Sequence, residues 1–452
     1  MNYYLLRMQT MYARPKTGTK RKNQQIWIRV AVLIGLLLIL YKPSMASLPK
    51  GSITTVTGDT TQGYNGDGDD FDATKALVNL PMGVAINPTG GKSGELFISD
   101  AGNHRIRKVD LFHWNIFTVA GNGSGDFRGD GELAINASIK NPAGISVGVD
   151  GSIFIADRGN HRIRKVDPNG QISTIAGGTK PGLSGDGGLA TQAALKDPMD
   201  VEVDDVGNVL IADFGNSRIR RVDARTGVIS TIAGSGQRRY DGDNKPALEA
   251  GMSPSGLAFD GSGGLLIADM RNQRIRRIDL ETGIIATIVG TGKRGFLGDG
   301  DLGVGAHLNN PSWVAVSERN DIYITDTGNN RIRKVDGLTG IITTVGGSGE
   351  AGYGGENGPA AEAHLWSPFG IAVDPAENIY IADYLNHRVR RINQRKAEPI
   401  IFNPPKSGGG WLKVFLVAVP SSVVITYLII TGREPDLQKP PGFPDPPDSS
   451  VR

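Results

Sequence analysis

Short apolar stretches alternate with turn-forming residues through most of the chain. In each unit an apolar stretch follows a proline, as in Gly83–Ile86 after Pro81, and a second one ends at an aspartate such as Asp100. A third stretch alternates charged and apolar residues, as in Arg105–Val109, and a fourth places Thr before Ile or Val. Short apolar stretches bounded by Gly, Pro, Asn and Asp are typical of strands joined by tight turns. Each unit therefore predicts four short strands.

The unit occurs six times. Its most regular part begins at Ile98 (ISDAGNHRIRKVD) and recurs at Ile155, Ile211, Ile267, Ile324 and Ile381. The aspartate of this segment returns every 56 or 57 residues. A single four-stranded sheet cannot bury both of its faces, so the units are expected to pack face to face around an axis.

The fourth stretch predicts how the ring closes. Its six copies begin at Thr55, before any complete unit, and no copy follows Asn393. Six outer strands match six sets of inner strands only if Ile53–Val56 completes the last unit. The prediction is an all-β, six-bladed propeller with four-stranded blades, closed by its N-terminal strand and spanning 51–397, with no free edge. Ile400–Phe402 is a competitor for the same edge.

The Asn-His-Arg-Ile-Arg core of the unit carries a family resemblance. It stands at Asn103–Arg107 and Asn160–Arg164, and at Asn386–Arg390 with Val389 for Ile. This segment resembles the NHL repeat, and the resemblance covers roughly 53–393. It implies a propeller fold. It does not specify a function, because NHL propellers include RNA-binding and ubiquitin-ligase scaffolds, extracellular sensors, adhesion proteins and an amidating lyase.

Charged residues recur within the unit. An arginine stands five residues after each repeated aspartate, and an ion pair across the turn is expected for Asp100/Arg105, Asp157/Arg162, Asp213/Arg218, Asp269/Arg274, Asp326/Arg331 and Asp383/Arg388. The connections between units share an aromatic-x-Gly-Asp-Gly pattern, as in Tyr64–Gly68. Aspartate before glycine favours a tight turn, and Ca²⁺ binding by these acids is the alternative.

Departures from the repeat mark candidate ligand-binding residues. The inner strands carry small residues, but one of them has Asp200 and Glu202 on the same face, and Trp313 replaces a glycine in another. His307 and His364 stand at equivalent places in successive units. Two imidazoles and a carboxylate could hold Zn²⁺, although no third histidine accompanies them.

Composition and charge narrow the partners. The chain of 452 residues has no Cys, which excludes disulfides, and its 63 Gly fit many turns. Its net charge is +3, but residues 1–50 contain nine basic and no acidic side chains. Residues 406–452 contain five basic and four acidic side chains. The body, 51–405, therefore has 35 basic and 42 acidic side chains, and we expect no nucleic-acid partner.

The sequences of the two ends predict that the protein is attached to a membrane. Basic residues precede the apolar run Val30–Leu40, which indicates a signal peptide or a signal anchor over 1–46. Residues 398–410 are interpreted as a linker, 411–432 as a transmembrane helix and 433–452 as a Pro-rich disordered tail. The positive-inside rule then places the propeller outside the cytoplasm, on a single-pass membrane protein.

Two functional hypotheses follow. The first is a membrane-tethered, non-catalytic binding or scaffold module for a protein, peptide or glycan, with no cofactor other than the Ca²⁺ alternative. The second is a metal-dependent enzyme, similar to the propeller lyases or lactonases, with its site at the central channel. The repeated histidines speak against the enzyme, because a repeated residue serves the blade, whereas catalysis needs a unique group.

Overall fold

The computed structural model describes residues 49–87, 94–178, 180–394, 400–402, 411–419 and 422–431. The chain forms two compact units, one of which is Pro49–Glu398. The other combines Met1–Leu48 with Pro399–Arg452. The signal sequence expected over 1–46 and the tail expected over 433–452 lie outside the described residues.

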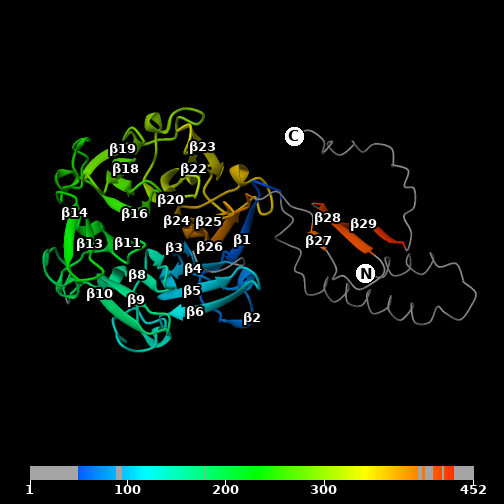
Figure 1. The fold of residues 1–452 in the computed structure, drawn as a ribbon, viewed down its shortest axis with the longest axis horizontal. Coiled ribbons are helices and arrows are strands. Elements are labelled where there is room, and N and C mark those ends of the chain that lie inside the picture. The colour runs from blue at the N-terminus through cyan, green and yellow to red at the C-terminus, as the bar shows by residue number, and fades with distance from the viewer. Residues whose placement is uncertain are drawn as a thin grey trace, which may run out of the picture. The chain divides into compact units, whose positions relative to one another are not determined.

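The unit Pro49–Glu398 is a ring of six antiparallel sheets, the blades (Figure 1). Blade 1 contains β2 (Gly68–Asp72), β3 (Pro81–Ile86), β4 (Glu95–Asp100), β5 (Arg105–Asp110) and β6 (Asn115–Ala120), and blade 2 contains β7 (Ile145–Val147), β8 (Ile153–Asp157), β9 (Arg162–Val166) and β10 (Ile172–Ala176). Blade 3 contains β11 (Pro198–Val203), β12 (Val209–Asp213), β13 (Arg218–Val222) and β14 (Ile229–Ala233). Blade 4 contains β15 (Lys245–Pro246), β16 (Pro254–Phe259), β17 (Gly264–Asp269), β18 (Arg274–Asp279) and β19 (Ile284–Val289). Blade 5 contains β20 (Pro311–Val316), β21 (Ile322–Asp326), β22 (Arg331–Val335) and β23 (Ile342–Gly346). Blade 6 contains β24 (Pro368–Val373), β25 (Ile379–Asp383), β26 (Arg388–Ile392) and β1 (Ile53–Gly58).

Single-turn 3-10 helices occupy two places in the unit. One set follows the second of the four repeated strands, which ends at the repeated aspartate. These helices are η3 (Ala101–Asn103), η5 (Arg158–Asn160), η7 (Phe214–Asn216), η9 (Met270–Asn272), η11 (Thr327–Asn329) and η13 (Tyr384–Asn386). The other set lies in the connections that lead into the blades: η1 (Ala73–Lys75), η4 (Ala134–Asn136), η6 (Ala190–Gln192), η8 (Ala247–Glu249), η10 (Gly303–Gly305) and η12 (Ala360–Glu362). The four predicted strands of each unit are confirmed, and β2 and β15 add a short fifth strand to blades 1 and 4.

The core lies between neighbouring blades. Phe154 and Ala156 of β8 pack against Val201 of β11 and against Val209 and Ile211 of β12, and none of the five is more than 5% exposed. Strands direct alternate side chains to opposite faces, so a blade between two others needs apolar residues on both faces. Burying a Val, Ile or Phe side chain contributes about 1.5–3 kcal/mol. Packing between blades therefore provides the main stabilisation of the ring.

The N-terminal strand closes the ring, as predicted. β1 pairs antiparallel with β26, with Ile53 opposite Ile392 (Figure 1). Ile53 and Val56 are fully buried. The carboxylate of Glu356 accepts hydrogen bonds from the Thr55 backbone N–H at 2.7 Å and from the Thr55 hydroxyl at 2.9 Å. Strands from the two ends of the propeller sequence thus share one sheet.

A buried arginine binds the repeated aspartate in every blade, but it is not the predicted one. Asp100 faces Arg107, seven residues on, at 3.3 Å, and both side chains have 0% exposure. The predicted partner, Arg105, lies at the end of its strand, where it donates to the backbone carbonyls of Asn103 and Asn122. Arg107 has no solvent access, so its charge requires carboxylates nearby.

The same correction holds in the other blades. The observed pairs are Arg164–Asp157, Arg220–Asp213, Arg276–Asp269, Arg333–Asp326 and Arg390–Asp383, in place of the predicted Asp157–Arg162, Asp213–Arg218, Asp269–Arg274, Asp326–Arg331 and Asp383–Arg388. Each buried arginine also binds an acid of the incoming connection, namely Asp67, Asp130, Asp186, Asp243, Asp299 or Glu356. These are the acids considered as Ca²⁺ ligands, and each of them forms an ion pair with a guanidinium of the protein.

In five of the six blades, the residue after the 3-10 helix that follows the second strand accepts a backbone N–H of the connection to the next blade. In blade 1 this residue, His104, has φ 55°, and its Nδ1 accepts the Asn141 backbone N–H of the connection to blade 2 at 3.2 Å. His387 does the same for Leu80 of blade 1, at 3.1 Å. In blade 5 the Asn330 side-chain oxygen accepts the Ser367 N–H at 2.9 Å. A histidine here is a structural acceptor that an amide can replace.

The C-terminal segment differs from the prediction. A transmembrane helix was expected over 411–432, but Trp411–Val419 forms β28 and Ser422–Thr431 forms β29, and the two pair antiparallel. The many Val, Ile, Tyr and Phe residues of these segments favour strands. β27 (Ile400–Phe402), within the expected linker, pairs with β28 and does not compete with β1. Among the described residues, no helix has the length and apolar character needed to cross a bilayer.

Candidate functional site

Both the turns that follow the second strands and the connections between blades lie on one face of the ring. Pro81, where β3 begins, pairs with Asp100, where β4 ends. Turn asparagines hold the connections in place, since Asn272 donates to the Arg238 carbonyl at 2.9 Å and Asn329 to the Gly295 carbonyl at 2.7 Å. We call this face, which carries η3, η5, η7, η9, η11, η13 and the connections, the mouth face.

An apolar cluster lies at the centre of the mouth face. Met82, Ala101, Ala143 and Met199 are buried and pack with the half-buried rings of Phe214, Phe369 and Tyr384; we call these residues the mouth cluster. The centroids of the Phe369 and Tyr384 rings lie 5.9 Å apart. Blades 1, 2, 3 and 6 contribute to this cluster, so it forms only when these four blades are brought together. Half-buried aromatic rings around an axis provide an anchor for an apolar group.

Eight basic side chains lie in one sector of the mouth face, from blade 2 to the connection that enters blade 5. This cationic sector consists of Lys140, Arg158, Lys196, Arg238, Arg239, Arg271, Lys293 and Arg294. Arg158 is half-buried and the others are exposed. The Arg271 guanidinium lies 5.3 Å from the Phe214 ring centroid, so the sector borders the mouth cluster.

The cations of this sector have no carboxylate partners among the described residues. Two nearby acids are engaged elsewhere: Asp126 with Arg128 at 3.1 Å and Asp241 with Lys245 at 2.8 Å. A third acid, Asp197, is not paired by His161, because the ring nitrogen 3.7 Å from its carboxylate accepts the Asp197 backbone N–H and so has no proton to donate. Like charges gathered on one face raise the local concentration of oppositely charged partners. The sector is therefore an anion-attracting surface on a body with more acids than bases.

Asp200 is an interior residue and not a surface ligand. It is 1% exposed, and its carboxylate accepts the Leu257 backbone N–H of blade 4 and its neighbour Val201 N–H at 2.8 and 2.9 Å. Gly144 of blade 2 packs so closely against it that a Cβ there would overlap the carboxylate. Burial raises the pKa of Asp200, and the charge of Glu202 raises it further. Asp200 thus ties three inner strands together.

Glu202 lies nearer the opposite end of the inner strand. It is half-buried, and its carboxylate accepts the Ser146 hydroxyl of blade 2 at 3.0 Å. At the same level the other inner strands carry small residues: Ala85, Ser146, Ala258, Ala315 and Ala372. Burial raises the pKa of Glu202 to about 7, against the lowering effect of its hydrogen bonds. A carboxylate that titrates near neutrality is a candidate for binding a cation or proton in the channel.

Trp313 packs inside the ring. It is 4% exposed, its ring centroid lies 5.8 Å from that of Phe369, and its backbone would meet a Cβ at Gly256 of blade 4. The glycine of the preceding blade therefore accommodates the tryptophan of the next one. Trp313 supports the mouth cluster from below, and it presents no ring to solvent.

The two candidate histidines lie in separate connections. His307 is half-buried beside Gly295, and its backbone N–H bonds to Leu297. The Nε2 atom of His364 lies 3.3 Å from Glu350, which is 78% exposed. In the part of the chain that the structure describes, no group of three or more His, Cys, Asp or Glu side chains is arranged to hold a metal ion.

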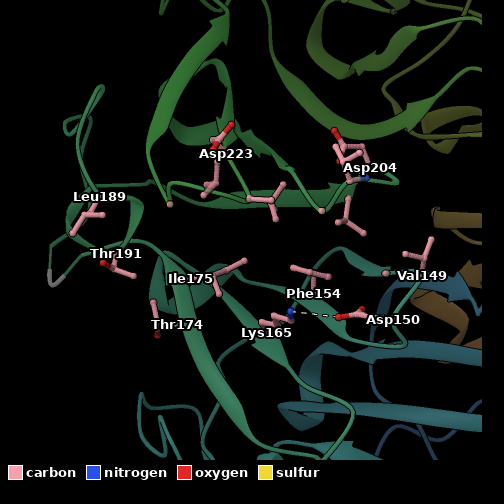
Figure 2. A pocket seen from close by; sticks show the side chains of 18 residues that line it. Val149, Asp150, Phe154, Lys165, Thr174, Ile175, Leu189, Thr191, Asp204 and Asp223 are labelled. Carbon is pink, nitrogen blue, oxygen red and sulfur yellow. Dashed lines mark hydrogen bonds and ion pairs between the residues drawn. The ribbon is translucent and has the colours of Figure 1, made fainter.

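A groove of about 540 Å³ lies between blades 2 and 3 (Figure 2). Phe154, Ile175 and Leu189 line it, and Val149 and Asp204 come from loops at the end opposite to the mouth face. Lys165 pairs with Asp150 across its rim at 3.7 Å, as the dashed line in Figure 2 shows. The groove offers mainly apolar walls, so it can bury an apolar side chain.

Sequence reasoning missed the cationic sector. Most of its members stand at different positions along the repeat, and the net charge of the body averages them with its acids. One signal was available: Lys140 and Lys196 stand two residues before the repeated proline, where blades 1, 5 and 6 carry Asn79, Asn309 and Trp366. Only the folding of connections onto turns brings these positions together.

Comparison with protein families supports the repeat assignment. A model described as the NHL repeat matches residues 308–335 and 365–392, which contain the turns of blades 5 and 6. A model described as the Teneurin NHL domain matches residues 112–184.

Several curated proteins are similar over most of the propeller. Protein SUPPRESSOR OF QUENCHING 1, chloroplastic, of Arabidopsis thaliana is 29% identical over 334 residues, which cover 71% of this chain and 31% of that protein. NHL repeat-containing protein 2 of Gallus gallus is 30% identical over 350 residues, covering 69% and 47%. Teneurin-1 of Gallus gallus is 31% identical over 291 residues, covering 56% and 10%. The chain spans less than half the length of these relatives.

Solved structures share the fold. A Bacteroides thetaiotaomicron protein of unknown function matches with a TM-score of 0.55 at 19% identity, over 75% of this chain and 74% of that one. An auxiliary nutrient binding protein from the same organism matches with a TM-score of 0.54 at 17% identity, over 76% of each chain. At such identities the likeness concerns the fold alone.

Proposed function

Because the chain belongs to the NHL-repeat β-propellers, we propose that it is a non-catalytic binding or scaffold module that engages its partner through the mouth face. The observation that carries the proposal is the cationic sector beside the mouth cluster. Eight basic side chains that have no carboxylate partners among the described residues repel one another, so gathering them on one face costs electrostatic free energy. An external anionic partner gives this arrangement a purpose.

The other repeated charges are used within the blades. Each buried arginine binds two carboxylates, and the arginine at the start of each third strand donates to backbone carbonyls, as Arg218 does to Asn216 and Ser235. The cations of the sector are therefore additional to the charged residues that form ion pairs and hydrogen bonds within the blades. Residues that add nothing to stability but share one face are candidates for recognition.

The experiment compares two charge-reversal pairs in the full chain. One pair, Arg238→Glu with Arg239→Glu, lies in the cationic sector, and the matched pair, Arg225→Glu with Arg319→Glu, lies on exposed loops of the opposite face. Both pairs are exposed, so both variants should fold. In cells that express the chain, cross-linked partners should be lost by the first variant and retained by the second. Equal recovery by both variants would contradict the proposal.

An address outside the cytoplasm is a further part of the proposal. It rests on the leader over 1–46, in which basic residues precede the apolar run Val30–Leu40. Protease added to intact cells or vesicles should spare the propeller if it lies in the cytoplasm, and should cleave it at exposed loops if it lies outside. Protection without detergent would reject this address.

A further inference from the structure

We infer that the ligand of the mouth face is an acidic, extended polypeptide segment whose carboxylates lie along the cationic sector while one apolar side chain rests on the mouth cluster. This inference rests on the proposed function and names its partner class. Three observations carry it: the sign of the charge, the apolar anchor at the axis, and the state of the aromatic rings nearby.

The charge of the sector is opposite to that of the body. Residues 51–405 contain 35 basic and 42 acidic side chains, yet the sector carries eight cations that pair with no carboxylate in the part of the chain that the structure describes. The loops of the opposite face carry both signs, with acids such as Asp204 and Asp223 beside bases such as Arg225 and Arg319. A cluster of one sign on the mouth face therefore orients an approaching anionic chain toward that face. Because the cations extend over several blades, they match a chain of many anionic groups better than one small anion.

The mouth cluster supplies an anchor beside these charges. The half-buried rings of Phe214, Phe369 and Tyr384 lie around the axis, and Arg271 covers the Phe214 ring at 5.3 Å. Trp366, which is 44% exposed, adds a large apolar side chain next to blade 6. Recognition of polypeptides commonly combines one buried apolar or aromatic anchor with a charged rim.

The aromatic rings of the connections argue against a single-stranded nucleic acid. Such partners need free ring faces on which bases stack in succession. Here arginines already cover these rings: the guanidinium carbons of Arg162, Arg274 and Arg331 lie 3.9 Å from the ring centroids of Phe127, Tyr240 and Phe296. These three connection rings therefore offer no successive stacking platforms beside the cations, and the aromatic surface that remains is gathered in one place, at the mouth cluster and Trp366. A polypeptide requires charge and one anchor, both of which are present.

The test is direct binding of a defined probe to the full chain. The probe is a fluorescent peptide of about 16 residues, rich in Glu and Asp, with one central Phe; it reaches about 50 Å when extended. The control probe has Gln and Asn in place of every acid. We expect saturable binding of the acidic probe, measured by anisotropy, that weakens as salt is raised. The neutral probe should bind weakly at every salt concentration.

Variants locate the site. Arg238→Ser with Arg239→Ser should weaken binding of the acidic probe about five- to thirtyfold, whereas Arg225→Ser with Arg319→Ser on the opposite face should leave it unchanged. Trp366→Asn introduces the residue that blades 1 and 5 carry at this position, so it should fold normally and still weaken binding. Equal binding by all of these proteins would overturn the inference.

The same binding experiment also tests other classes of partner. Tighter binding of single-stranded polyuridine RNA or of a sulfated polysaccharide than of the acidic peptide would overturn the choice of a polypeptide. The outcome also separates this inference from the proposed function. If mouth-face charge reversal abolishes partner cross-linking but no variant affects peptide binding, the binding face stands and the acidic peptide is rejected.

Discussion

Asp213 and Arg220 lie seven residues apart, on the two strands that flank one turn, and their side chains meet at 3.5 Å with no exposure to solvent. Arg220 also binds Asp186 of the incoming connection, at 2.8 Å. One guanidinium thus joins the second strand, the third strand and the connection of a blade. Burial raises the pKa of Asp213 to about 6, although hydrogen bonds from Asn216 and Lys196 and the charge of Arg220 oppose the shift.

Replacing this arginine should destabilise the propeller strongly. Arg220→Met fills similar space but leaves Asp213 buried without a cation, which typically costs about 3–5 kcal/mol. The measurement is the free energy of unfolding from denaturant titration. Arg225→Met is the matched control, because Arg225 is exposed, and it should change stability by less than about 0.5 kcal/mol. Similar losses in both variants would show that the buried position is not what matters.

An aromatic side chain in the connection to blade 3 should stabilise the propeller. In the other five blades an aromatic residue of the connection lies 3.9 or 4.0 Å from the first arginine of the third strand. Blade 3 has Leu183 there, beside Arg218. Leu183→Tyr should add a cation–π contact and stabilise the propeller by about 0.5–1 kcal/mol. The reverse change in blade 2, Phe127→Leu, should destabilise it by a similar amount. Equal thermal midpoints for all three proteins would contradict both expectations.

Ring closure depends on β1. Removing residues 1–58 deletes the fully buried Ile53 and Val56 and exposes the edge of β26. The loss should be about 3–6 kcal/mol from apolar burial alone. Removing residues 1–48 is the control, since it leaves β1 in place. Calorimetry should show a lower unfolding temperature, or loss of a single transition, in the longer truncation only. Matching transitions in the two truncations would refute closure by β1.

The histidine that links blade 6 to blade 1 should make stability depend on pH. His387 accepts the Leu80 N–H through Nδ1, which it can do only when that nitrogen is unprotonated. Burial lowers the pKa of His387 below its usual 6.5. Its contribution is therefore present above pH 6.5 and is lost as the pH falls through its folded-state pKa.

The variant His387→Asn isolates this effect. Asn330 makes the same contact in blade 5 with an amide oxygen that does not titrate. Wild type should lose stability relative to the variant when the pH falls from about 7.5 to about 5, because all other titrating groups are common to both. Thermal midpoints at a series of pH values provide the comparison. A constant difference across the series would reject the link.

The sequence predicted the architecture because the repeat encodes it locally. Each blade repeats proline, aspartate and turn residues at fixed spacing. The first copy of the fourth strand, at Thr55, precedes any complete unit. Counting strands was therefore enough to place β1 beside β26. The turn histidines were rightly assigned to the blade, since Asn330 occupies the same role.

The sequence did not predict which side chains form ion pairs or how deeply side chains are buried. The sequence predicted Arg105 as the partner of Asp100. The observed partner is Arg107, because it is the arginine buried from solvent, whereas Arg105 lies at the end of the strand and donates to backbone carbonyls. Asp200 and Trp313 break the repeat, yet both turned out to be interior residues, because small neighbours, Gly144 and Gly256, make room for them. A break in a repeat marks special packing as readily as a ligand site.

The sequence alone determined the number of blades, the strand that closes the ring and the acidic balance of the body, since these depend on periodicity and composition. Only the tertiary structure decided which arginine is buried and that eight cations from separate turns and connections share the mouth face. It also replaced the expected C-terminal helix with β28 and β29. The physical reason is the same in each case: proximity in space, exclusion of water and strand pairing arise between segments that are distant in the chain.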